Sequence, residues 1–156
     1  MRANLPRIRQ NVLPTFNKLR PEPFCSEVNK SSWTAQCSNG SEILFVSESI
    51  KDDPELNKMR GFEVNGFLLE EANEMSLKTF HAAQERAGTW IVPGAKVQPP
   101  ALIMATCNPG QSWVKDEFYD PSLAGKLPPG RYFLQANAND NPYVTDEQKE
   151  RWKSLP

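Results

Sequence analysis

The chain has 156 residues, 18 Lys and Arg against 19 Asp and Glu, a formal net charge of −1 and 38% apolar residues. This size indicates one domain. The balanced charge argues against a typical nucleic-acid-binding domain, which carries an excess of basic residues to bind phosphates. No apolar run approaches the roughly 20 residues of a membrane span, so we expect a cytoplasmic protein without a membrane partner. Three cysteines with no C-x-x-C pair and one histidine predict reduced, buried thiols and no zinc site.

The first part of the chain changes from a helical to a strand-like pattern. Residues 1–24 are basic and broken by proline, and a short amphipathic helix over Ile8–Leu19, interrupted by Pro14, is expected there. Its basic face is either solvated or a nucleic-acid contact. Residues 31–47 predict a β-hairpin, because Asn39-Gly40 suits the positive φ of a tight turn between two alternating runs.

The middle of the chain has the order strand, helix, strand. Gly66-Phe-Leu-Leu, followed by Glu70-Glu71, predicts a buried parallel strand that ends in two acids. A helix follows over 76–87, with Ser76 as its N-cap and a glycine after its end. Ala101–Cys107 predicts a second buried strand, so residues 66–107 have the length of a right-handed βαβ unit.

The last part of the chain, 108–156, has weaker patterns. Trp113, Val114 and Phe118 form an apolar set on a short predicted helix, which core packing explains. Arg131–Ala136 predicts another strand. The tail from Asn139 to Lys153 predicts a capped helix, because Thr145 is followed three residues later by Gln148.

An apolar strand that ends in two acids is the physical core of a Walker B site, in which one carboxylate holds Mg²⁺ and the next polarises water. The alternative is that Glu70 and Glu71 merely end a strand in solvent. The neighbouring strand ends in Thr106-Cys107-Asn108, small polar side chains at the same sheet edge, where ligands of parallel sheets collect. The 156 residues contain no G-x-x-x-x-G-K-[ST] phosphate loop.

Several motifs, taken in order, resemble the ATPase domain of tailed-phage terminase large subunits. They are Asn39-Gly-Ser41 with Ile43-Leu-Phe45, Arg60-Gly61, Gly66-Phe-Leu-Leu-Glu-Glu-Ala-Asn73, Met104-Ala-Thr-Cys-Asn-Pro109 with Trp113-Val114, and Asp140-Asn-Pro142. The resemblance runs from about residue 2 to the end of the chain. It implies an α/β fold, part of a RecA-like (ASCE-type) three-layer sandwich with a mostly parallel sheet, with 1–156 as a partial ATPase domain.

The resemblance also implies residue roles. Glu70 would hold Mg²⁺ through water, and Glu71 would be the catalytic carboxylate acting on ATP. The stretch from Ala105 through Thr106 and Cys107 to Asn108 matches the coupling motif, which senses the γ-phosphate. Arg60 matches the position from which the family supplies an arginine finger to a neighbouring subunit, the alternative being an ordinary loop arginine.

The implied function is ATP hydrolysis that drives viral double-stranded DNA into procapsids. The implied partners are the portal protein, the small terminase subunit and further copies of the large subunit in a ring. In the family a Walker A loop precedes this region and an endonuclease domain follows it, so the resemblance implies an internal piece of the motor. The alternatives are a non-catalytic remnant that serves as an interaction module, and another P-loop motor such as a helicase.

Overall fold

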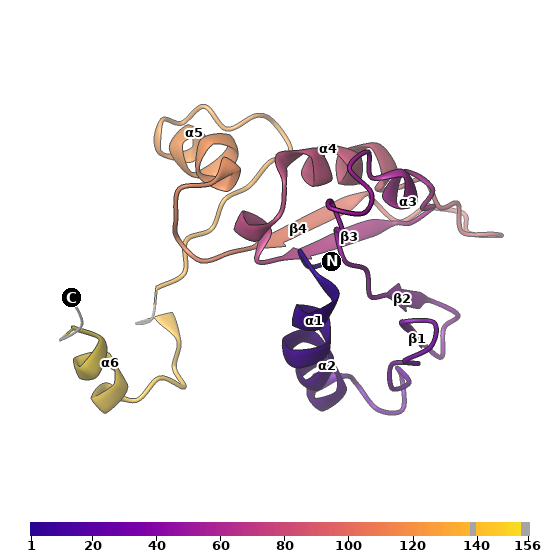
Figure 1. The fold of residues 1–156 in the computed structure, drawn as a ribbon, viewed down its shortest axis with the longest axis horizontal. Helices are drawn as coiled ribbons and strands as arrows, with labels where there is room; N and C mark the ends of the chain where they lie inside the picture. Colours follow the sequence, from indigo (N-terminus) through magenta and orange to yellow (C-terminus); the bar gives the residue numbers. More distant parts are fainter. Residues whose placement is uncertain (138–139, 154–156) are drawn as a thin grey trace. The chain divides into compact units, whose positions relative to one another are not determined.

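The computed structural model describes residues 1–137 and 140–153, which belong to two units, Met1–Val114 and Lys115–Pro156. The chain is a mixed α/β protein with a small parallel sheet and a separate hairpin (Figure 1). Within the described residues, no helix is long and apolar enough to cross a membrane.

The first unit begins with a helical segment made of α1 (Leu5–Arg7), a wide π-turn over 8–12 and α2 (Leu13–Leu19). The wide turn lies just before Pro14, whose ring would collide with the carbonyl of Gln10 in a regular helix. The helix therefore continues through the predicted interruption. The wide turn also changes which side chains face inward, so Leu13 is buried while Leu19, the last residue of the predicted helix, is 71% exposed.

The predicted hairpin is confirmed with short strands. Antiparallel β1 (Thr34–Gln36) and β2 (Glu42–Leu44) pair with Thr34 opposite Leu44. Gly40 has a φ of +83° in the connecting turn, a conformation that glycine adopts without steric cost. The helical segment packs on this hairpin through a small core. Its buried members are Ile8, Leu13, Val28 and Ala35.

The prediction of reduced, buried thiols is wrong. The chain leading into the hairpin runs antiparallel to it at Cys25 and Cys37, which brings the two residues together as a disulfide. Cys107, the remaining cysteine, is exposed. Spacing in the sequence did not reveal this pairing because a loop and a turn separate the two cysteines.

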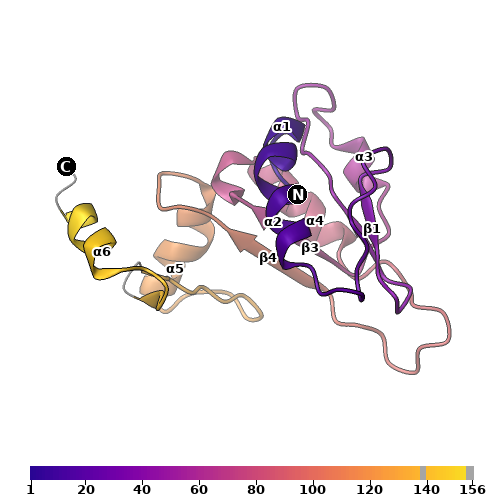
Figure 2. The ribbon, with the colours of Figure 1, turned by 90° about the horizontal axis from the view of Figure 1, so that it is seen from below.

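The parallel pair consists of β3 (Gly66–Glu70) and β4 (Leu102–Thr106), in register from Gly66 opposite Leu102 to Glu70 opposite Thr106. Between them α4 (Leu77–Arg86) is capped by Ser76, whose hydroxyl accepts from the amide of Thr79. The strands and the helix are present as predicted. Figures 1 and 2 both show the long loop between α4 and β4 projecting away from the strands.

The two strands are covered on one face only, and no residue of β4 is fully buried, which corrects the prediction of two buried strands. Leu69 faces α4 and is fully buried, whereas Leu68 on the opposite face is 53% exposed. Leu102 and Met104 of β4 lie on that same open face and are more than half exposed. The reason is that α4 covers one side of this pair while the other side carries no comparable layer within the described residues.

The chain start and a short helix complete the first unit. Met1 and Arg2 lie between β3 and residues 46–48, with backbone hydrogen bonds to both. Helix α3 (Asn57–Arg60) packs on α4 through Met59 and the preceding residue Leu56. These contacts attach both the N-terminus and α3 to the βαβ segment.

The second unit contains a π-turn over 115–119, α5 (Asp120–Leu123) and α6 (Asp146–Lys153). The predicted capped helix is confirmed, because Thr145 and Gln148 exchange hydrogen bonds, while Asn139 lies outside the described residues. The strand predicted over Arg131–Ala136 is wrong. Its residues pair with no strand in the described part of the chain, and Tyr132 and Leu134 are almost fully exposed.

Candidate functional site

The carboxyl ends of β3 and β4 bring polar side chains together. The register places Glu70 beside Thr106. Glu71 follows β3 directly, and Asn108 lies two residues beyond the end of β4. The Asn108 amide nitrogen lies 3.4 Å from each of the two Glu71 carboxylate oxygens. Glu71 has a φ of +52°, a left-handed conformation that is uncommon for a residue with a side chain and occurs often at functional turns.

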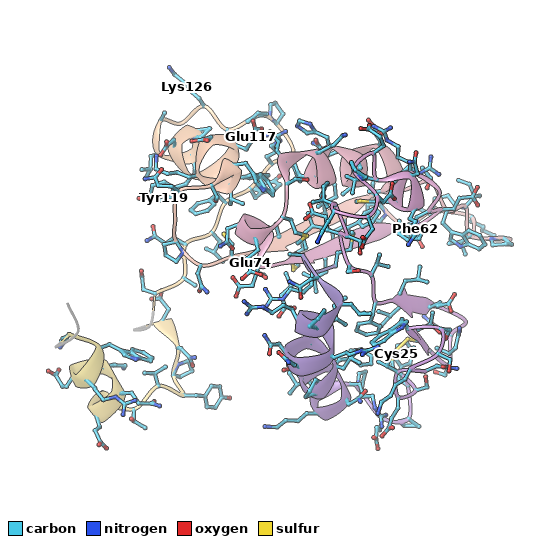
Figure 3. The ribbon with its side chains drawn as sticks, viewed as in Figure 1. Cys25, Phe62, Glu74, Glu117, Tyr119 and Lys126 are labelled. Carbon is cyan, nitrogen blue, oxygen red and sulfur yellow. A yellow bond between two sulfur atoms is a disulfide. The ribbon has the colours of Figure 1, made fainter. Side chains whose placement is uncertain are left out.

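Glu70 has a different partner. Its carboxylate lies 3.5 Å from Nε of Arg2, and Nη1 of Arg2 lies 3.4 Å from Glu74 (labelled in Figure 3). Arg2 is only 4% exposed, so its charge would be costly to bury without these carboxylates. Arg7 adds a weaker contact to Glu74 at 3.9 Å. Glu70 and Glu74, which flank Glu71 in the sequence, are therefore tied to the N-terminal segment.

The other members of the predicted coupling motif line the end of β4. Ala105 and Thr106 belong to the strand and Cys107 follows it, and all three are exposed. Partial burial raises the pKa of the Cys107 thiol, and the charge of Glu71 raises it further. The thiol thus stays in its protonated, weakly nucleophilic form at neutral pH.

Arg60 lies away from this edge. It ends α3 on the surface, where its amide donates to the carbonyl of Leu56. Phe62, two residues later, lies at the end of the parallel pair opposite to Glu74 in Figure 3. Within one chain, therefore, the structure does not bring Arg60 to Glu71.

Two side chains support the site through hydrogen bonds that were not predicted from the sequence, which indicated only core packing for Trp113. Glu48 is buried and accepts hydrogen bonds from the amide of Ser76 and the hydroxyl of Thr79, which fixes the start of α4. Trp113 donates from its indole to the carbonyls of Ala72 and Met75, in the turn after Glu71. Both contacts join residues far apart in the sequence, so no local pattern could have indicated them.

The comparisons with known proteins give one family. The model of the phage terminase large subunit family matches residues 16–156, which is most of the chain and includes every residue of the site except Arg2 and Arg7. Searches of curated proteins and of solved structures gave no match. With nine-tenths of its length matched by that family model, the chain belongs to the phage terminase large subunit family.

Proposed function

We propose that this chain carries the ATP-hydrolysing site of a phage DNA-packaging motor, at the carboxyl ends of β3 and β4, and that Glu71 is the general base of this site. The observation that carries the proposal is the pairing of Glu71 with Asn108 where two parallel strands end. This edge is where open parallel sheets bind their ligands. Membership of the terminase large subunit family supports the packaging role.

The proposed chemistry is an in-line attack of water on the γ-phosphate of ATP. Glu71 accepts the proton of the attacking water, and a positioned general base of this kind contributes about 10²–10⁴-fold to a rate. Asn108 donates toward both oxygens of that carboxylate and so orients it. Thr106 and Cys107 lie beside the pair and complete the coupling motif that begins at Ala105.

ATP would supply the phosphoryl group, and Mg²⁺ would supply the positive charge that balances the phosphate oxygens. The carboxylates of Glu70 and Glu71 suit Mg²⁺, a cation that prefers oxygen ligands and commonly takes one or two carboxylates together with phosphates. In the described part of the chain, no three His, Cys, Asp or Glu side chains lie close enough to hold a metal ion alone. The proposal therefore needs phosphate oxygens as further ligands, and Glu70 must share its charge between the metal and Arg2.

The chain's 156 residues contain no phosphate loop, so a different segment must bind the phosphates. We place that segment in a fuller RecA-like three-layer sandwich, in which β3 and β4 would be two of the strands. Arg60, at the other end of β3, would act on a neighbouring subunit of a ring as its arginine finger. Double-stranded DNA, the portal protein and the small terminase subunit are the proposed partners.

A packaging assay tests this function. Terminase carrying Glu71→Gln should lose ATP-driven uptake of DNA into procapsids, because glutamine cannot accept the proton of the attacking water. Glu85→Gln, an exposed position on α4, is the matched control and should package normally. Normal packaging by the Glu71→Gln terminase would contradict the proposal.

A further inference from the structure

Trp113 connects the segment after β4 to the turn after β3. Its indole Nε1 donates to the carbonyl of Met75 at 2.9 Å and to that of Ala72 at 3.1 Å. One indole proton serves both carbonyls, which makes this a shared, three-centre hydrogen bond. Ala72 is fully buried and Met75 is nearly so, which means the bond lies inside the first unit.

The indole ring is itself held in place. It stacks on Phe80 of α4, with ring centroids 5.0 Å apart and an angle of 24° between the planes. Phe80 is buried at 4% exposure. Because close-packed side chains in a core have few alternative positions, the direction of the indole N–H is fixed by the helix on which the ring rests.

Asn108 and Trp113 therefore hold the same turn from a single segment. Asn108 reaches the side chain of Glu71, and Trp113 reaches the carbonyls one and four residues later. The Asn108 contacts are long, at 3.4 Å, and Glu71 has a strained positive φ, so their alignment depends on the surrounding structure.

We infer that Trp113 is a positioning residue whose indole N–H holds the 108–113 segment against the 71–75 turn and so keeps the Asn108 amide on the Glu71 carboxylate. The inference rests on the proposed role of Glu71 as the general base. Trp113 touches no reacting atom and acts through Asn108 and Glu71.

The first test uses this chain without nucleotide. Since coupling between two sites is reciprocal, Asn108→Ala should raise the hydrogen-exchange rate of the Trp113 indole N–H by about threefold to tenfold, the size expected for loosening one hydrogen bond. Trp113→Phe, which keeps an aromatic ring and removes the donor, should shift the side-chain amide resonances of Asn108 in the direction that Glu71→Gln shifts them. Trp90→Phe, at an exposed indole, is the control and should change neither signal.

The second test uses terminase that hydrolyses ATP. Trp113→Phe should lower kcat by about tenfold with KM unchanged, because positioning of the base matters to the chemical step and not to substrate binding. In a Glu71→Gln background the same change should have no further effect on kcat, whereas a general loss of stability would add to it.

The outcomes separate the two proposals. An unchanged exchange rate of the Trp113 indole N–H in Asn108→Ala overturns the positioning role. If Trp113→Phe does not fold, the Asn108→Ala variant tests that role by itself. A folded Trp113→Phe with wild-type kcat and unchanged Asn108 resonances overturns it too. Full hydrolysis by Glu71→Gln instead contradicts the proposed function, while the exchange result would still report the link between the two segments.

Discussion

Arg2 carries its charge into the first unit and meets two carboxylates there. Its side chain is 5% exposed, while those of Glu70 and Glu74 are 38% and 34% exposed. Taking an arginine out of water is expensive unless its charge is balanced, so Arg2 effectively fixes where the two acids lie. Glu71, which lies between them in the sequence, contacts the side chain of Asn108 instead. Neighbouring acids in one sequence motif thus have separate partners.

Asp53 shows a simpler use of a carboxylate. Its oxygens accept from the amides of Asn57 at 3.0 Å and Lys58 at 2.9 Å, at the start of α3. The hydrogen bond from the Lys58 amide, followed by that from Asn57, lowers the pKa of Asp53 below its ordinary value of 3.8. Such a group stabilises the folded state when it is ionised.

We predict a pH-dependent effect of Asp53→Ala on stability. Because the folded pKa is lowered, the contribution of Asp53 is complete above pH 3.8 and is lost as the pH falls through the folded pKa. Thermal unfolding should show a small loss of stability in Asp53→Ala near neutral pH and a vanishing difference from wild type in strong acid. Asp52→Ala is the control at an exposed neighbouring position. A difference that grows on acidification would contradict the stabilising role assigned to these two hydrogen bonds.

At the scale of elements, the parallel pair is asymmetric. The side chain of Leu69 points toward α4 and is completely buried, while that of its neighbour Leu68 points to the open face. Adjacent residues of a strand alternate between faces, so two leucines with the same intrinsic preference for strands have very different surroundings. The stability of the pair should therefore come mainly from one face.

This asymmetry gives a matched pair of substitutions. Leu69→Ala should lower the free energy of unfolding by about 3 kcal/mol, the cost of removing a large side chain from a core. Leu68→Ala should cost less than about 1 kcal/mol, mainly through a lower preference for the strand. Urea unfolding of the two variants measures the difference. Equal losses would show that both faces of β3 are covered in the folded chain.

The predictions from the sequence succeeded where the signal was local. The apolar runs of β3 and β4, the Asn39-Gly40 turn and the Ser76 cap each depend on neighbouring residues, and all are present. The predicted strand over Arg131–Ala136 failed because a short run of residues that favour strands forms one only when another strand is available to pair with it.

In the candidate site, too, only part of the arrangement was predictable from the sequence. The pairing of Glu71 with Asn108 follows from strand order and from the shared edge of a parallel sheet. The ion pair of Arg2 with Glu74 spans 72 residues, and the hydrogen bond from Trp113 to Ala72 spans 41. Contacts over such separations depend on the whole fold, and no motif in the chain indicates them.

At the scale of the whole molecule, the candidate site belongs to one unit. Glu71, Asn108 and Trp113 all lie in Met1–Val114, and the second unit begins directly afterwards at Lys115. The family match extends across both units, from residue 16 to residue 156. The first unit is therefore the part in which changes to single side chains test the proposed chemistry.

Binding and single-turnover hydrolysis of ATP by terminase carrying Glu71→Gln test the central claim most directly. A general base acts on the chemical step, so the variant should bind Mg²⁺ and ATP with the affinity of the wild type and hydrolyse the bound ATP at least about 100-fold more slowly. Hydrolysis at the wild-type rate after equal binding would show that Glu71 is not the base and would contradict the account.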